Sequence, residues 1–287
     1  MPPILGLIVG IVAVSTASTL IRMAQDSVSS LAVAAWRLTL ASLLLAPFAL
    51  SSKRLEWQSL TRREWGWLFM SGAFLAVHFY TWIVSLEMTS VAASVVLVAT
   101  APFFVGIISH LFLDERLTRR MVIGMGVALL GTLMISVGDM RAGTHRLLGD
   151  SLALVGAVAV AGYMLVGRRL RKRLSLVGYV FPVYGTAAVI LMGAALFSRT
   201  PLWGYAADTW VCLLLVALFP QVVGHSAFNW ALEYLPTTYV SLATLVEPLG
   251  SALLAWLILR EAAPPAALGG GILILFGIVL ATWHREG

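Results

Sequence analysis

Two stretches of this sequence are variants of one pattern: residues 86–115 read LEMTSVAASVVLVATAPFFVGIISHLFLDE, and residues 232–261 read LEYLPTTYVSLATLVEPLGSALLAWLILRE. A constant offset of 146 residues aligns them without a gap and pairs Glu87 with Glu233, Pro102 with Pro248, and Glu115 with Glu261. Further along, it pairs Gly124 with Gly270 and Gly131 with Gly277. Chance matches of leucine and glycine are common between apolar helices, but matched glutamates are not. The sequence therefore predicts an internal duplication.

The composition indicates the class of protein. Hydrophobic residues make up 60% of the 287 residues, charged residues only 11%, and the mean hydropathy is +0.93. Soluble domains carry about 45–50% apolar and about 25% charged residues, so this chain has too few charges to cover a water-facing surface. A soluble enzyme, a disordered chain and a nucleic-acid-binding domain are disfavoured. Long apolar runs favour an all-α membrane protein over a membrane β-barrel.

Ten apolar stretches are long enough to cross a bilayer as helices, which takes about 20 residues each. They lie near residues 4–22, 31–50, 65–86, 91–113, 121–138, 149–167, 178–198, 209–232, 238–259 and 266–284. Little chain remains for a domain outside the membrane. Five spans fall in residues 1–140 and five in 149–287, and because five is odd, the second repeat must be inverted. Inverted repeats are typical of secondary transporters, whose substrate site lies near the midplane between the halves.

The C-terminal part of each half resembles the EamA repeat of the drug/metabolite transporter superfamily. The family pattern is a mid-helix proline, a glutamate about 13 residues later and a glycine-rich helix, as in LFLDERLTRRMVIGMGVALLGTLMI and LILREAAPPAALGGGILILFGIVL. Arg37, in AAWRLTLASLLL, resembles the arginine of the second helix in the first repeat. The resemblance implies ten helices, a central cavity and export of small metabolites or amino acids. Among members, the chain looks most like the YddG-type exporters of aromatic amino acids.

The distribution of basic residues predicts the orientation. If the N-terminus is cytoplasmic, 13 of the 19 lysines and arginines fall on the cytoplasmic side, mainly in residues 53–63, 116–120 and 168–173. Five fall on the opposite side, and Arg37 lies within a span. The positive-inside rule therefore places both termini in the cytoplasm. We expect a multi-pass protein of the cell inner membrane, and its single cysteine, Cys212, cannot form an intramolecular disulfide.

Two spans carry aromatic and polar residues at helical spacing. His78, Thr81, Trp82 and Ser85 share one face of span three, and Trp82 and His78 could sandwich a planar substrate. Span eight has Gln221, His225, Phe228 and Asn229 at spacings of three and four. The repeat offset pairs Trp82 with Phe228, but His225 is one position out of register with His78. We favour His78 for the cavity and leave His225 open.

The two matched prolines predict bends beside a cavity. Pro102 and Pro248 lie near the centres of spans four and nine, where a proline removes a backbone hydrogen bond and frees a carbonyl. Thr244 shares a helical face with Pro248 and is a candidate hydrogen-bonding group for the substrate. Tyr163 in span six is a candidate to close the cavity opposite Trp82. The candidate substrate-binding residues are His78, Trp82, Pro102, Tyr163, His225, Phe228, Thr244 and Pro248.

Glu247 is the one acidic residue deep within a span. It could be protonated, paired with Arg37 or used for proton coupling, and we interpret it as a structural glutamate with satisfied hydrogen bonds. Four glutamates lie near span ends, where we expect contacts with loops and helix ends: Glu87, Glu115, Glu233 and Glu261. The glycine-rich spans five and ten lack buried polar groups and are interpreted as scaffold.

The chain contains none of the phosphate-loop, zinc-protease or nucleophile-elbow motifs that would indicate an enzyme. Five scattered histidines and one cysteine predict neither a metal site nor a cofactor. The expected partners are a small-molecule substrate and the lipid bilayer, without nucleic acid. A secondary exporter explains the duplication, while a lipid-modifying intramembrane enzyme, a channel and a scaffold subunit stay as alternatives. The sequence specifies neither the substrate, the coupling ion nor the oligomeric state.

Overall fold

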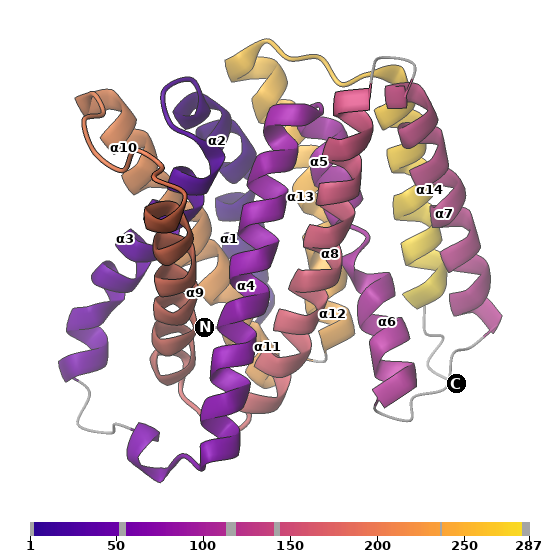
Figure 1. Cartoon of the computed structure of the whole chain (residues 1–287). Helices are drawn as coiled ribbons and strands as arrows, with labels where there is room; N and C mark the ends of the chain where they lie inside the picture. Colours follow the sequence, from indigo (N-terminus) through magenta and orange to yellow (C-terminus); the bar gives the residue numbers. More distant parts are fainter. Residues whose placement is uncertain (1–2, 52–55, 113–118, 141–143, 236, 283–287) are drawn as a thin grey trace.

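The computed structural model describes residues 3–51, 56–112, 119–140, 144–235 and 237–282, and within these ranges all regular structure is helical (Figure 1). Seven helical stretches are long and apolar enough to span a membrane: Pro3–Gln25, Ser30–Ser51, Arg62–Met88, Val91–Ile108, His145–Arg171, Leu176–Phe197 and Ala207–Tyr234. Shorter apolar helical segments lie at Val122–Met134, Thr244–Leu259 and Pro265–Gly277. The all-α membrane class is confirmed. The count of ten spans stays a prediction.

The helices of the first half are α1 (Pro3–Ser15), α2 (Ala17–Gln25), α3 (Ser30–Ser51), α4 (Arg62–Met88), α5 (Val91–Val98), α6 (Ala101–Phe112) and α7 (Arg119–Met140), with a 3-10 turn at Glu56–Ser59. Local sequence explains where several of them begin. Thr61 and Glu64 form a capping box before α4, in which the Thr61 amide donates to Glu64 Oε2 over 2.8 Å. Ser90 accepts a hydrogen bond from the Ala93 amide at 3.1 Å and so caps α5.

The helices of the second half are α8 (Thr144–Arg171), α9 (Leu176–Phe197), α10 (Ala207–Val216), a π-helix η2 (Ala217–His225), α11 (Ser226–Tyr234), α12 (Thr237–Ala243), the 3-10 turn η3 (Thr244–Val246), α13 (Glu247–Leu254), a π-helix η4 (Ala255–Leu259) and α14 (Pro265–Thr282). Ser175 caps α9 by accepting from the Gly178 amide at 3.1 Å. The chain is thus continuously helical through several stretches whose hydrogen-bonding pattern changes partway.

Both matched prolines mark helix interruptions, as the sequence predicts. The span that contains Pro102 is divided between α5 and α6 just before this proline. The span that contains Pro248 changes from α12 to η3 and then to α13, and Pro248 lies in the first turn of α13. Proline lacks an amide hydrogen and cannot donate the hydrogen bond of a regular helix, so the two breaks have the same cause.

A third irregularity, in span eight, was not predicted. The chain forms the π-helix η2 across Ala217–His225, with Pro220 inside it. Because a π-helix closes its hydrogen bonds five residues apart instead of four, residues on either side no longer share the face that regular helical spacing gives them. Gln221 turns to a fully buried position that contacts α3.

The helices pack in pairs that correspond across the two halves. α3 packs against α9, α7 against α14, α5 against α13 and α6 against α12, while α4 packs against α8 and the α10–η2–α11 stretch packs against α1 and α2. Exchanging the halves by the offset of 146 residues reproduces each of these pairings. Figure 1 shows α7 and α14 together at one side of the molecule, with α3, α9 and α10 at the other. This packing is what a two-fold relation requires. The repeats at 1–140 and 149–287, and their inversion, stay predictions.

Glycine permits the close crossing of α7 and α14. A Cβ atom on Gly131 would lie 2.5 Å from the Gly270 carbonyl oxygen, and one on Gly277 would lie 2.5 Å from the Gly124 carbonyl oxygen. The two contacts are equivalent, because the offset of 146 residues pairs Gly131 with Gly277 and Gly124 with Gly270. Such small-residue contacts let membrane helices approach at backbone distance. They explain the glycine pattern of spans five and ten.

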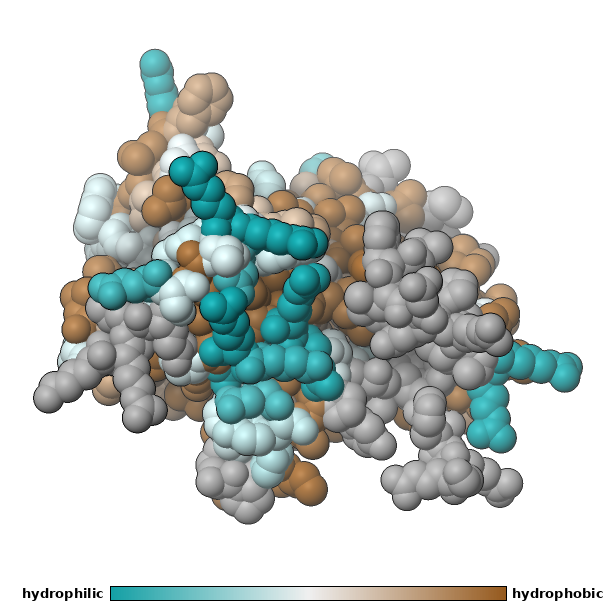
Figure 2. All heavy atoms as spheres, turned by 90° about the horizontal axis from the view of Figure 1, so that it is seen from below, coloured by the Kyte–Doolittle hydropathy of each residue, from teal (hydrophilic) through white to brown (hydrophobic). Residues whose placement is uncertain are grey.

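The exterior is apolar around the helices and charged at one end. Exposed side chains include Phe48, Val189, Phe197, Leu249 and Ile272, each more than half accessible, which a hydrocarbon environment explains. The lower end in Figure 1 contains the start of α4 and the end of α8, and Figure 2, viewed from below, shows hydrophilic side chains gathered there. The chain is therefore a multi-pass membrane protein.

Candidate functional site

A cavity lies between α4, α5 and α8 from one side and η2, α11 and the η3–α13 junction from the other. Apolar residues of α5, α8 and α11 form part of its wall, among them Val95, Val98 and Val160. Its polar and aromatic lining residues are His78, Trp82, Tyr163, His225, Phe228, Asn229, Thr244 and Glu247. An apolar pocket with a few convergent polar groups is the usual form of a small-molecule site.

Six of the eight candidate substrate-binding residues line this cavity: His78, Trp82, Tyr163, His225, Phe228 and Thr244. Pro102 and Pro248 do not, but their preceding residues, Ala101 and Glu247, do. The prolines therefore shape the wall through the helix breaks that they cause. The structure brings together residues that lie far apart in the sequence, and their role in substrate binding stays a prediction.

His78 is held by the backbone of α8. Its Nδ1 atom lies 2.9 Å from the Gly156 carbonyl oxygen, and because a carbonyl only accepts, Nδ1 is the donor. A neutral His78 thus has its lone pair on Nε2. Gly156 lets α8 approach α4 closely, because it has no side chain. A Cβ atom at this position would lie 3.2 Å from Thr81 Oγ1. The imidazole is fixed by the close packing of these two helices.

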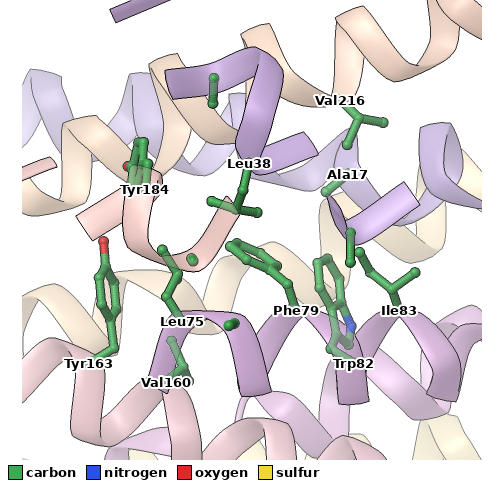
Figure 3. Close-up of a cluster of buried hydrophobic side chains, with 14 of the residues drawn as sticks. Ala17, Leu38, Leu75, Phe79, Trp82, Ile83, Val160, Tyr163, Tyr184 and Val216 are labelled. Carbon is green, nitrogen blue, oxygen red and sulfur yellow. The ribbon is translucent and has the colours of Figure 1, made fainter. Parts of the chain in front are cut away.

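Trp82 and His78 stack directly on each other. Their ring centroids are 5.8 Å apart and their planes differ by 11°. This is the separation of two aromatic rings in contact, so no third ring fits between them. The predicted sandwich is therefore wrong for this conformation. The pair instead forms a single two-ring wall, with the Phe79 ring 6.3 Å from that of Trp82 (Figure 3).

His225, whose placement the sequence leaves open, also lines the cavity. Its ring lies 6.3 Å from that of His78 and 5.1 Å from that of Phe79. The two histidines are out of register by one residue in sequence, yet the π-helix that ends at His225 brings both to the same cavity. Sequence spacing alone could not reveal this, although Pro220 was a signal for an irregular helix.

Tyr163 joins α8 to α11 at the cavity wall. Its hydroxyl accepts a hydrogen bond from Asn229 Nδ2, which also donates to the His225 carbonyl oxygen over 2.8 Å. In Figure 3, Tyr163 and Trp82 lie on opposite sides of Leu75 and Phe79. This placement agrees with a tyrosine across the cavity from Trp82. The contact joins two helices of the second half of the chain.

Arg37 is a feature of this region that sequence reasoning did not assign to the site. The side chain is fully buried in α3, and its Nε donates to Gln221 Oε1 over 2.8 Å. The guanidinium carbon lies 3.9 Å from the centroid of the Phe79 ring and 5.8 Å from that of Trp82. An arginine inside an apolar span was the available signal, because such charges usually have a function.

Glu247 lines the cavity beside the α13 break and is only partly buried. Among the described residues, no hydrogen bond to its carboxylate and no ion pair within 4.0 Å is found. The interpretation as a structural glutamate with satisfied hydrogen bonds stays a prediction.

Three of the glutamates near span ends make the predicted contacts. Glu261 Oε1 accepts from the Val91 amide over 2.7 Å, and Glu87 Oε1 accepts from the Ser30 amide over 3.2 Å. Glu233 pairs with Arg171, which is almost fully buried. Each of these contacts joins separate helices at an end of the bundle. Glu115 lies outside the described residues.

The cavity is narrow in this conformation. Its volume is about 60 Å³. A ligand larger than this would require its walls to separate. Within the described ranges, no group of three His, Cys, Asp or Glu side chains could hold a metal ion. The chemistry available is aromatic contact, hydrogen bonding and charge pairing.

Comparison with known proteins agrees with this architecture. The EamA-like transporter family matches residues 1–137 and again residues 147–283. The chain is 26% identical to an uncharacterized transporter of Archaeoglobus fulgidus, over 94% of both chains. It is 28% identical to a probable terminal-alkyne amino-acid exporter of Streptantibioticus cattleyicolor, over 64% of this chain and 61% of that one. It is also 25% identical to the pseudopaline exporter CntI of Pseudomonas aeruginosa, over 80% and 79%.

A solved crystal structure shares the fold, with a TM-score of 0.70 at 18% identity, over 96% of this chain and 95% of that one. The family match covers both halves of the chain and almost its whole length. It agrees with the apolar helices and with the cavity between them. The chain therefore belongs to the EamA-like transporter family.

Proposed function

We propose that this chain exports small zwitterionic metabolites, most favourably aromatic amino acids, by alternating access around the central cavity. The observation that carries the proposal is the lining of the cavity by residues of both halves of the chain. Aromatic walls such as Trp82 and Phe228 suit a planar side chain, and His78, Asn229 and Glu247 suit polar groups. Two relatives are named as exporters, one of them of an amino acid, which supports this substrate class.

In the proposed mechanism, the five-helix repeats 1–140 and 149–287 rock about the cavity and expose it to one side of the membrane at a time. Inverted-repeat transporters work in this manner. The helix pairings that reproduce themselves at the offset of 146 residues support the repeat relation. The narrow cavity supports a conformation in which neither entrance is wide. The substrate then binds near the midplane, between α4 and the η2–α13 region.

The proposed setting is the inner membrane of the cell, with both termini in the cytoplasm. The excess of basic residues on one side supports this orientation. At the end of the bundle seen in Figure 2, the exposed Arg173 pairs with Glu64 and lies near Arg63 and Arg169. That end would face the cytoplasm, so export proceeds from it toward the opposite end.

Overproduction in cells tests export. We expect tolerance to toxic analogues of aromatic amino acids, together with lower internal concentrations of those analogues. Val98→Trp should abolish the effect, because Val98 lines the cavity and a larger ring would fill it. Val189→Trp is the matched control, since Val189 is 73% accessible on the outer surface of α9. Unchanged internal pools with the wild-type chain present in the membrane would contradict the proposal.

A further inference from the structure

Buried hydrogen-bond donors without partners gather around Arg37. Its Nη1 and Nη2 atoms, Gln221 Nε2 and Trp82 Nε1 are all inaccessible, and none has a hydrogen-bond partner among the described residues. Nearly all buried polar atoms in proteins are hydrogen-bonded, so a group of unpartnered ones requires an explanation. All four of these atoms donate and one side chain carries a positive charge. The group therefore suits an anionic acceptor.

The contacts that Arg37 does make orient it without occupying its fork. Its Nε donates to Gln221 Oε1 at 2.8 Å, and the guanidinium lies over the Phe79 ring with 3.9 Å between its carbon and the centroid. These interactions fix the plane of the group and leave the two terminal nitrogens free. Two parallel N–H donors on a fixed plane match the two oxygens of a carboxylate.

The guanidinium is close to the cavity. The Phe79 ring that covers it lies 5.1 Å from His225, which is part of the cavity wall. The guanidinium carbon also lies 5.8 Å from the centroid of the Trp82 ring, which is part of the cavity wall. One aromatic ring thus separates an unused anion-binding group from the space where a substrate would lie.

We propose that Arg37, oriented by Gln221, binds the carboxylate of the transported amino acid after the Phe79 side chain moves aside. This inference rests on the proposed function and defines its substrate more closely, as a molecule with a free carboxylate. Glu247 and Asn229 Oδ1, which also belong to the cavity lining, are acceptors for the substrate's ammonium group. The site therefore has a cationic and an anionic end. A ligand with an aromatic ring but no carboxylate would contact only the apolar part of the site.

The competing explanation is that Arg37 only neutralises the charge of Glu247. No ion pair within 4.0 Å joins the two side chains, and the terminal nitrogens of Arg37 are not used by Glu247. If neutralisation were the whole role, Arg37→Gln and Glu247→Gln would change the binding of all ligands in the same way. A carboxylate site instead predicts that only Arg37→Gln selectively weakens ligands with a carboxylate.

The test compares phenylalanine with phenylalaninamide, which keeps the ring and the amino group but lacks the carboxylate. Both are titrated calorimetrically into the purified full-length protein, as wild type and as Arg37→Gln, Arg37→Lys and Glu247→Gln. We expect the wild type to prefer phenylalanine and Arg37→Gln to weaken phenylalanine at least about tenfold while changing phenylalaninamide by less than about threefold. Arg37→Lys should be intermediate, because lysine keeps the charge but not the fork.

Each variant is judged by the ratio of its affinities for phenylalanine and phenylalaninamide. A partial folding defect lowers both signals and therefore does not produce the expected change in this ratio. Equal weakening of both ligands by Arg37→Gln, an unchanged ratio, or a wild type that binds the amide as tightly as the acid would overturn the carboxylate site. Glu247→Gln should not reduce the preference for the acid. A wild type that binds and transports no amino acid would instead refute the proposed function, and the inference with it.

Discussion

Arg22 and Arg168 make the same contact at opposite ends of the bundle. The two residues are 146 positions apart, and their guanidinium groups donate to the carbonyl oxygens of Leu86 and Leu232, which are also 146 positions apart. Leu86 lies near the end of α4 and Arg168 near the end of α8, and these helices pack side by side in opposite directions (Figure 1). The chain thus has an equivalent arginine contact at each end of the bundle.

The first prediction is that these contacts hold the two entrances closed. In a Cys212→Ser background with a reporter cysteine at Val98, Arg22→Gln should speed labelling by a membrane-impermeant reagent from the Leu86 end. Arg168→Gln should speed it from the other end. The loss of a hydrogen bond from a charged group shifts the equilibrium between closed and open entrances by roughly fivefold or more.

Arg62→Gln serves as the control, since Arg62 is exposed at the start of α4 and should leave both labelling rates unchanged. The idea of paired closures fails if both arginine variants increase labelling from the same side, or if neither changes it. Glu261→Gln should resemble Arg22→Gln, because Glu261 pairs with Arg22 at 3.2 Å.

The second prediction concerns Trp82 as the aromatic wall of the site. Trp82→Ala should weaken the apparent affinity for an aromatic amino acid by about 1–2 kcal/mol, or roughly 5- to 30-fold. Trp82→Phe should retain most of the affinity because it preserves an aromatic surface. Substrate titration of flux measures both variants. Leu275→Ala in α14 is the control: it removes a side chain that packs in the scaffold, so it should lower stability more than affinity. If Leu275→Ala lowered the affinity and Trp82→Ala did not, the site would have been assigned to the wrong helices.

The third prediction concerns the crossing of α7 and α14. Gly131→Ala and Gly277→Ala should each destabilise the protein by about 1–3 kcal/mol, because the added methyl group would overlap a backbone carbonyl oxygen. Gly126→Ala, on the same helix as Gly131, is a matched control with nothing within 4 Å of the new Cβ. It should be neutral or slightly stabilising, since alanine favours helix more than glycine does. Thermal unfolding in detergent distinguishes them, and equal melting temperatures for Gly131→Ala and Gly126→Ala would contradict the close crossing.

Much of the fold could be predicted because its signals are local. Long apolar runs give the helices, and Pro102 and Pro248 give the interruptions in α5–α6 and α12–α13. The glycine pattern of spans five and ten is typical of helices that can approach closely. These features depend on helix length, backbone donors and side-chain size, which can be judged without knowing the neighbours.

The features that could not be predicted are contacts between particular side chains. The π-helix turns Gln221 toward Arg37, and that hydrogen bond joins residues 184 positions apart. Equal spacing also suggested that His78 and Trp82 could hold a ring between them, but residues four apart on a helix lie too close and stack on each other. The helical face of a residue could be predicted from spacing, whereas its partner on another helix could not.

The fourth prediction concerns orientation. Cysteines introduced at Lys172 and Ala206, in a Cys212→Ser background, lie at exposed positions on opposite ends of α9. In intact cells, an impermeant reagent should label the position at Ala206 and not the one at Lys172, because the basic end should be cytoplasmic. Permeabilised cells should label both. Labelling of Lys172→Cys from outside would reverse the orientation and with it the direction of transport.

The most direct test of the central claim is counterflow of radiolabelled phenylalanine into proteoliposomes that contain the purified protein and unlabelled phenylalanine. A transporter with an amino-acid site should accumulate label transiently, with a rate that saturates, and Val98→Trp should abolish this accumulation while Val189→Trp preserves it. Absence of counterflow with phenylalanine and every other amino acid tested, from correctly folded protein, would contradict the account.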